Sequence, residues 1–361
     1  MTNVKREIYL NCAALSAAVF ICGMIIIFAG ENPLSVFMLF ISDAFGTVTG
    51  FLYTLYYTTP LIFTGLAVGL GFRAGLFNIG AEGQLYAGAF AAAWAGITLN
   101  FLPGWLQLPC AILAAAAAGG IWGWIPGYLK GKFGSHEVIT TIMMNFIAFG
   151  IVGYLITKPF HDPSDVIPQT VEISPSAQIP LIADVVKYIG IDIPRSVPLN
   201  MSFLIAIAAA VIVYILLWKT VPGYEIRASG ASPEAAAAGG INVIRVTALT
   251  MAACGALAGL VALNEILGYR HRFLLNFSPG YGFTGIAIAL MGRNHPFGIL
   301  AAALLFGALT RGAIIIDINF ENISKDIIYI FQGIIILFIA GRNYKSLFNL
   351  KQRFLKRAEN V

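Results

Sequence analysis

Apolar runs of about 20 residues recur along the whole chain, and this feature limits the possible folds more than any other. A helix of that length matches the thickness of the hydrocarbon layer of a bilayer, about 30 Å. No segment shows the repeated ten-residue alternation that a membrane β-barrel requires, so helices are the expected spans. We predict ten spans, two of them short, at 8–29, 51–71, 76–99, 107–129, 137–157, 201–218, 246–267, 281–292, 297–316 and 326–341.

The composition agrees with a chain that lies mostly inside the bilayer. Hydrophobic residues make up 58% of the chain and charged residues 11%, whereas a soluble domain averages about 25% charged residues. The first apolar run, 8–29, follows Lys5 and Arg6 and is too long for the apolar core of a typical signal peptide, so it is predicted to be an uncleaved span. The expected fold class is an all-α integral membrane protein, with residues 1–361 as one transmembrane domain surrounded by lipid.

Lysine and arginine are unevenly divided between the two sides that these spans define. Of the 22, 15 fall on the side that holds the N-terminus, and 7 fall on the other side or at its edge. Because cytoplasmic loops of membrane proteins carry the excess of positive charge, both termini are predicted to be cytoplasmic. The segments 219–245 and 342–361 then lie in the cytoplasm, and the segment 158–200 lies outside.

The larger of the two cytoplasmic segments carries the signals of a short helix. Ser232 is a suitable N-cap, Pro233 fits the first helical position, and Glu234 lies in the first turn, where the helix dipole favours negative charge. Gly239 and Gly240 can end the helix in a left-handed conformation. Because so small a helix buries little on its own chain, we interpret it as a docking element for a soluble partner. The alternative is a helix that lies on the lipid headgroups.

Two glycine-rich polar stretches, at 72–84 and 276–285, interrupt the apolar runs in opposite halves of the chain. Unwound backbone exists at membrane depth only where it lines a cavity or is packed in protein, so paired interruptions indicate a transport pathway. The first stretch is either a turn at the cytoplasmic edge or the middle of a helix broken over 61–94, and both interpretations stay open. The candidate pathway residues are the polar side chains of these stretches and one amide in the span 137–157: Asn78, Glu82, Gln84, Asn145, Ser278, Tyr281 and Thr284.

Other polar or small residues in the apolar runs have simpler explanations. Glu137 lies at the start of a predicted helix, where capping of the dipole explains it better than transport does. Spaced glycines such as Gly65 with Gly69, and Gly255 with Gly259, predict helices that pack closely. Further polar groups within the predicted spans or at their ends are Asn264, Glu265 and Asp317.

The external segment 158–200 holds seven of the sixteen prolines. It is predicted to be extended, with one short amphipathic helix near 181–189. Loops of this length in compact proteins are usually functional or disordered, so the segment is a candidate for docking a partner on the outer face.

Motifs for catalysis, metal binding and nucleotide binding are absent from the sequence. The four cysteines lie in apolar runs without paired spacing, and the four histidines are scattered, which argues against a metal or redox site. No phosphate-binding loop, zinc-protease motif or nucleophile elbow occurs. We therefore predict no catalytic residues, no metal and no cofactor in this chain, so any energy source for transport belongs to another chain. The basic residues are spread over short loops, so no nucleic-acid partner is expected.

Permease subunits of bacterial ABC importers contain segments that resemble four motifs of this chain, in the same order. The family is the branched-chain amino acid/ribose permease superfamily, and the motifs are FRAGLFNIGAEGQ at 72–84, HEVITTIMMN at 136–145, GYEIRASGASPEAAAAGGI at 223–241 and NFSPGYGFTGIAIALMGRNHP at 276–296. The resemblance covers roughly 50–345. Within the family the chain looks most like the longer permease of nucleoside (simple-sugar-type) importers.

This resemblance implies a fold and a set of partners. The fold is the helical permease of the vitamin-B12-importer type (type II), with two pseudo-repeated halves. Ser232–Gly240 would be the coupling helix that fits a cleft in the ATPase subunit, and Arg227 would be part of its support. The implied partners are an ATP-binding cassette ATPase, which binds the ATP and Mg, a second permease in a heterodimer, and an extracytoplasmic substrate-binding lipoprotein.

The implied function is import of nucleosides, purine or pyrimidine, across the bacterial cytoplasmic membrane, by a multi-pass subunit that is not itself an enzyme. Two alternatives stay open. One is the same architecture importing a simple sugar such as ribose or galactose. The other is a secondary transporter coupled to an ion gradient, which would move solute without ATP in liposomes that contain this chain alone.

Overall fold

A computed structural model of the chain describes residues 16–17, 19–187, 190, 193–324, 326, 329–334 and 337. Most of these residues are helical, and the only β pairing among them consists of two isolated bridges. The first predicted span, 8–29, includes a described helix over Val19–Phe28. Most of the predicted span 326–341 and the whole tail 342–361 lie outside the described residues.

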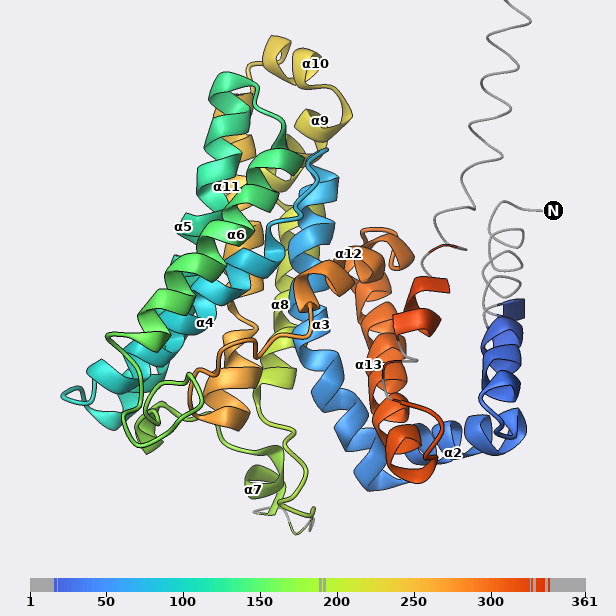
Figure 1. The fold of residues 1–361 in the computed structure, drawn as a ribbon. Helices are drawn as coiled ribbons and strands as arrows, with labels where there is room; N and C mark the ends of the chain where they lie inside the picture. Colours follow the sequence, from blue (N-terminus) through green and yellow to red (C-terminus); the bar gives the residue numbers. More distant parts are fainter. Residues whose placement is uncertain are drawn as a thin grey trace, which may run out of the picture. The chain divides into compact units, whose positions relative to one another are not determined.

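The helices belong to two compact units (Figure 1). Residues 48–308 form one, called here the large unit, and the described parts of 1–47 and 309–361 form the other, the small unit. The helices in order are α2 (Pro33–Gly46), α3 (Val48–Arg73), α4 (Ala81–Thr98), α5 (Gly104–Phe133), α6 (Glu137–Thr157), the 3₁₀ turn η1 (Pro175–Ala177), α7 (Ile182–Val186), α8 (Ser202–Lys219), α9 (Val221–Ala231), α10 (Pro233–Ala238), α11 (Val243–Gly259), the π-helix η3 (Leu263–Arg270), α12 (Tyr281–Met291) and α13 (Pro296–Asn319).

Six helical segments in the described part of the chain are long and apolar enough to cross a membrane: α3, α5, α6, α8, α11 continued by η3, and α13. Each corresponds to one predicted span. The predicted spans 76–99 and 281–292 correspond to α4 and α12, which are not among the six. Since α12 has 11 residues, it is about 16 Å long and too short to cross alone. The all-helical membrane fold is therefore confirmed, whereas ten crossings are not established.

The large unit has two ends (Figure 1). One end carries α9, α10 and the turn between α5 and α6, and the other carries α7 and the rest of the segment 158–200. The helix directions bring to the α9–α10 end the cations of the large unit that the sequence assigns to the cytoplasmic side: Arg73, Lys130, Lys132, Lys219, Arg227, Arg245 and Arg293. The predicted short helix near 181–189 is confirmed as α7.

Glycines bring the backbones of α5 and α11 into direct contact. A Cβ atom on Gly255 would lie 2.0 Å from the carbonyl oxygen of Gly119, and one on Gly259 would lie 2.4 Å from that of Ala115. On α3, a Cβ atom on Gly65 would meet side-chain atoms at 2.8 Å. These positions accept no side chain, so the prediction that spaced small residues serve close helix packing is confirmed.

The small unit contains a buried ion pair between α2 and α13. The guanidinium of Arg311 contacts the Asp43 carboxylate through two hydrogen bonds, of 2.6 and 3.0 Å. Both side chains are largely buried, with exposed fractions of 13% and 16%. This two-pronged geometry is the strong form of an Arg–carboxylate contact. The sequence places Arg311 among the outer-side cations, and it does not predict α2.

The connection between α3 and α4 runs from the α9–α10 end into the interior of the large unit. At its start, a Cβ atom on Gly75 would lie 3.1 Å from the carbonyl oxygen of Gly230 in α9. At its end, the backbone N–H of Gly83 donates a 2.8 Å hydrogen bond to Asn145, eight residues and about 12 Å inside α6. Residues 74–80 of this stretch are unwound, between the end of α3 at Arg73 and the start of α4 at Ala81. The stretch is therefore not a turn confined to the edge: it breaks the helical run, and its backbone re-enters the protein.

Candidate functional site

The α9–α10 end carries the short helix predicted at 232–240. The helix is α10, and the Ser232 hydroxyl accepts a 3.3 Å hydrogen bond from the backbone N–H of Ala235 as an N-cap. Gly240 follows it with a φ of 86°, in the left-handed region. Of its alanines, Ala236 is buried and the other three are exposed. The structure adds α9, which begins after Thr220 and which the sequence does not predict.

Arginines lie at the base of this pair of helices. The guanidinium groups of Arg73 and Arg227 are close enough for their charges to interact. Arg73 also donates a 2.8 Å hydrogen bond from Nε to the carbonyl oxygen of Asn294, and its guanidinium lies 5.2 Å from the ring centre of Trp218. Among the described residues, Nε of Arg227 is buried without a hydrogen-bond partner. Arg73 therefore connects α3 to α8 and to the turn before α13.

Three of the predicted pathway amides lie together, buried in the large unit. The side chains of Asn78 and Gln84 form two mutual hydrogen bonds, of 2.9 and 3.0 Å. Asn145 accepts from the N–H of Gly83 and donates to the carbonyl oxygen of Ile79 at 3.0 Å. The two bonds of Asn145 satisfy backbone groups at and before the start of α4, as buried backbone requires. All three side chains are buried, with exposed fractions of 3% or less.

Glu82 connects the two glycine-rich stretches. Its carboxylate accepts a 2.6 Å hydrogen bond from the backbone N–H of Gly282, in the first turn of α12, while Glu82 itself lies in the first turn of α4. The hydroxyl of Ser278 accepts hydrogen bonds from the N–H groups of Gly280 and Tyr281 and so caps α12. The structure thus brings the helix starts of both predicted stretches into contact.

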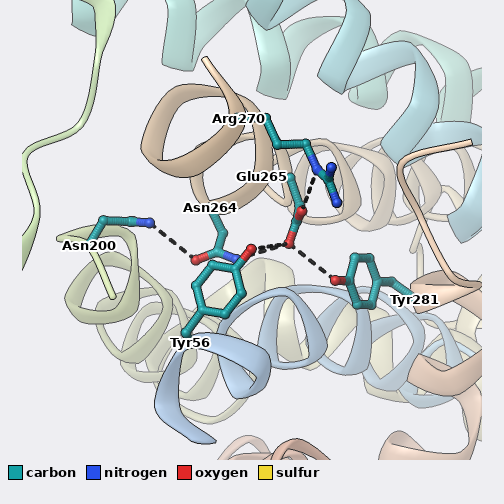
Figure 2. A network of polar contacts seen from close by, with 6 residues as sticks. All are labelled: Tyr56, Asn200, Asn264, Glu265, Arg270 and Tyr281. Atoms are coloured by element: carbon teal, nitrogen blue, oxygen red, sulfur yellow. Dashed lines mark hydrogen bonds and ion pairs between the residues drawn. The ribbon is translucent and has the colours of Figure 1, made fainter. Parts of the chain in front are cut away.

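A second polar network lies towards the other end of the large unit, on η3 (Figure 2). Asn264, Glu265 and Arg270 are on this π-helix, and π-helical turns frequently occur at functional sites. Glu265 is fully buried, and its Oε1 accepts hydrogen bonds from the hydroxyls of Tyr56 and Tyr281, at 3.3 and 3.1 Å. Asn264 donates to the same oxygen at 3.1 Å, and Oε2 lies 3.4 Å from Nε of Arg270.

This network forms part of the lining of a cavity of about 180 Å³. Its lining is mostly aromatic or polar, and it consists of Tyr53, Tyr56, Tyr57, Ser196, Pro198, Glu265, Tyr269, Arg270 and Tyr281. Tyr56 packs edge-to-face on Tyr57 and on Tyr269, with ring centres 5.0 and 5.3 Å apart. Tyr269 is 47% exposed. A partly open, tyrosine-lined cavity with a carboxylate and a guanidinium suits a small polar solute with an aromatic ring.

The segment 158–200 packs against this part of the large unit. Tyr53 donates a 2.7 Å hydrogen bond to the carbonyl oxygen of Ser196, and the Asn200 amide donates to Asn264 at 3.4 Å. Backbone bonds also join this segment to η3, for example from the N–H of Ile179 to the carbonyl oxygen of Leu267 at 2.8 Å. The segment is therefore packed onto the helix that carries Glu265.

Six of the seven predicted pathway residues separate into three groups. Asn78, Gln84 and Asn145 form the buried amide cluster, Glu82 and Ser278 hold the start of α12, and Tyr281 reaches the cavity. Thr284 lies half-buried in the first turn of α12. Of the described residues, no group of three or more His, Cys, Asp or Glu could hold a metal ion.

Sequence reasoning missed most of the cavity. Glu265 and Asn264 are visible in the sequence only as polar residues in an apolar run, and Arg270 only as a cation at the outer edge. Tyr56 and Tyr57 give no signal, because tyrosines are common near membrane surfaces. The available signal was the adjacent Asn264–Glu265 pair, since buried ionisable residues in spans are rare and usually functional.

Comparison with known proteins supplies a family. Residues 50–340 match the family described as branched-chain amino acid transport system / permease component. No solved structure matches this chain.

Curated relatives match nearly the whole chain. The chain is 37% identical over 321 residues to the guanosine ABC transporter permease protein NupP of Bacillus subtilis, which covers 88% of both chains. It is 33% identical to a glucose ABC transporter permease protein of Haloferax volcanii, over 96% of this chain and 90% of the relative. It is also 33% identical to the nucleoside ABC transporter permease protein NupB of Lactococcus lactis, over 99% of this chain and 98% of the relative.

Proposed function

This chain belongs to the family of permease components of the branched-chain amino acid transport system, and we propose that it is the membrane subunit of an ABC importer that carries nucleosides. The family consists of transport subunits, not enzymes. The observation that carries the proposal is the tyrosine-lined cavity in which Glu265 and Arg270 lie side by side.

The chemistry of this cavity suits a nucleoside. A nucleoside is uncharged and has a flat aromatic base joined to a sugar with several hydroxyl groups. Tyrosine faces stack on bases, and each stacked base contributes about 1–3 kcal/mol. The ion pair between Glu265 and Arg270 offers hydrogen-bond acceptors and donors while adding no net charge. A neutral solute can therefore bind without leaving an unpaired charge in the protein.

The names of the relatives support the same solute class. Two of the three relatives above are named for guanosine or nucleoside transport. The third is named for glucose, which makes a simple sugar the second candidate solute. The two solute classes share a ring with neighbouring hydroxyl groups, so one polar cavity of this kind could have served both in different members of the family.

The α9–α10 end is the proposed contact with the ATPase. We assign Ser232–Gly240 as the coupling helix, with Arg227 as part of its support, because α10 is a capped helix and three of its four alanines are exposed. In this assignment ATP and Mg bind to the partner ATPase. A second permease and an extracytoplasmic binding lipoprotein complete the importer, and the segment 158–200 is the proposed docking site for the lipoprotein.

This assignment fixes the proposed orientation. The α9–α10 end, with its cations, faces the cytoplasm, and the cavity lies towards the outside. Both termini are then cytoplasmic, in a bacterial cytoplasmic membrane. We further propose the type II permease architecture with two pseudo-repeated halves, because interrupted stretches from both halves meet at Glu82 and Gly282.

The decisive experiment measures uptake of radiolabelled nucleosides, ribose and glucose in cells that lack this chain, before and after the chain is restored. Restoration of nucleoside uptake alone is the expected result. Restoration of sugar uptake alone would replace the proposed solute with the second candidate. Solute movement without ATP, in liposomes that contain only this chain, would favour an ion-coupled transporter instead.

A matched pair of tyrosine variants tests the cavity itself. Tyr269→Ala removes a partly exposed ring at the cavity and should raise the KM of nucleoside uptake about tenfold. Tyr154→Ala removes an exposed ring on α6, outside the cavity, and should leave the KM unchanged. Equal effects of the two variants would remove the cavity from the transport pathway.

A further inference from the structure

The two oxygens of the Glu265 carboxylate differ in how many donors they have. Oε1 accepts from two tyrosine hydroxyls and from the Asn264 amide. Among the described residues, Oε2 has one donor, Nε of Arg270 at 3.4 Å. A carboxylate offers about four lone-pair sites. Oε2 therefore keeps acceptor capacity in the wall of the cavity, while the crowded Oε1 fixes the orientation of the group (Figure 2).

Arg270 offers complementary donors at the same wall. A guanidinium carries five N–H groups, and in the described part of the chain only its Nε has a hydrogen-bond acceptor. The side chain is 33% exposed, and its Cζ lies 5.7 Å from the ring centre of Tyr269. Free acceptor and donor positions thus lie next to each other, beside an exposed aromatic ring.

Neighbouring hydroxyl groups match this pattern. Each hydroxyl of a cis-diol can donate one hydrogen bond and accept another. A carboxylate that accepts from the 2′-hydroxyl of a ribose is the arrangement used for ribose in dinucleotide sites. In this arrangement the 2′-hydroxyl donates to Oε2 of Glu265, and the neighbouring 3′-hydroxyl accepts from the terminal nitrogens of Arg270.

The cavity volume indicates which part of a nucleoside it takes. Sites for drug-sized ligands usually have about 300–1,000 Å³, and this cavity has about 180 Å³. Because the cavity is smaller than this range, we place only the sugar of a nucleoside inside it. With the sugar inside, the base would lie on the exposed face of Tyr269.

We propose that Glu265 and Arg270 recognise the 2′,3′-diol of ribose, so that the permease itself prefers ribonucleosides to 2′-deoxyribonucleosides. This inference rests on the proposed nucleoside function. A deoxynucleoside would leave the buried Oε2 without its second donor. A site built to bind a hydroxyl group discriminates strongly against analogues that lack it, and we expect a preference of about tenfold or more.

The test compares uptake of radiolabelled guanosine in the presence of unlabelled guanosine or 2′-deoxyguanosine, with all partner subunits intact. The quantity measured is the half-inhibitory concentration of 2′-deoxyguanosine divided by that of guanosine. This ratio does not depend on how much permease reaches the membrane. The variants are Glu265→Gln and Arg270→Gln. Tyr154→Ala is the control, because this exposed tyrosine on α6 lies outside the cavity.

The expected ratio is about ten or more in the wild type and in Tyr154→Ala, and close to one in Glu265→Gln and Arg270→Gln. A high ratio that persists in both glutamine variants would place the preference in the binding protein and overturn the inference. A wild-type ratio of one, with guanosine uptake intact, would also overturn it and leave the proposed function standing. Absence of any guanosine uptake in the restored wild type would instead overturn the proposed function, and the inference with it.

Discussion

The Glu82 carboxylate accepts a 2.6 Å hydrogen bond from the backbone N–H of Gly282, and this contact joins the starts of α4 and α12 across 200 residues of sequence. Both helices present the positive end of their dipole to the carboxylate. There is no room for a side chain at this junction, because a Cβ atom on Gly282 would lie 2.4 Å from the backbone nitrogen of Glu82. The Glu82 carboxylate therefore links the two interrupted stretches, 72–84 and 276–285, which lie in opposite halves of the chain.

Glu82→Ala should destabilise the large unit by about 2 kcal/mol. The variant leaves the buried N–H of Gly282 unpaired, and hydrogen bonds to charged groups contribute about 1.5–3 kcal/mol. Glu82→Gln keeps an acceptor and should cost less. The measurement is the fraction of permease that stays monodisperse in detergent after heating, followed by size-exclusion chromatography. Glu321→Ala, at an exposed position in the small unit, is the control; a loss of similar size there would show that the contact with Gly282 is not the cause.

Gly255→Ala should disrupt the contact between α5 and α11. The new methyl group would lie 2.0 Å from the carbonyl oxygen of Gly119, so the helices must separate, and overpacking of this kind costs at least about 1–3 kcal/mol. Gly150→Ala, on α6, meets no atom within 4 Å. It should be neutral or stabilise the protein by up to about 1 kcal/mol, because alanine is the better helix former. The same heating assay compares the two variants, and equal stability would contradict the packing described here.

Local signals in the sequence predicted local structure. Ser232, Pro233 and Gly240 define α10 because caps and left-handed ends depend on a few neighbouring residues. Spaced glycines predicted close packing for the same reason, since the pattern lies on one helix. The family resemblance rests on such contiguous motifs and is confirmed over residues 50–340.

The cavity could not be predicted in the same way. Tyr56 and Glu265 are 209 residues apart, and only the packing of α3 against η3 brings them together. The π-helical turn that carries Glu265 and Arg270 has no reliable sequence signal. The path of residues 74–80 into the protein also could not be predicted. It depends on hydrogen bonds between buried amides, such as Asn78 with Gln84, and hydrophobic periodicity does not encode these bonds.

The ion pair in the small unit predicts a double-mutant result. Arg311→Leu should destabilise the protein by about 3–5 kcal/mol, because it leaves the largely buried Asp43 carboxylate without its guanidinium partner. The double variant Asp43→Leu with Arg311→Leu should recover most of this loss, since an apolar pair of similar size leaves no unpaired charge. Thermal denaturation of the purified permease measures both. A double variant as unstable as the single one would mean that the pair does not account for the effect.

The assignment of α10 as the coupling helix predicts a separation of two activities. Replacing Glu234 and Ala235–Ala238 with glycine and serine removes the helix but changes few buried contacts, since Ala236 is the buried residue of the five. Membrane insertion should therefore stay normal, while ATP hydrolysis by the assembled importer no longer drives uptake. Both rates are measured in proteoliposomes that contain all subunits. Gly150→Ala on α6, where a Cβ atom would meet no atom within 4 Å, should leave both rates and their ratio unchanged. Normal uptake in the α10 variant would remove the docking assignment, because a motion carried by rigid contact cannot pass through a helix that is no longer formed.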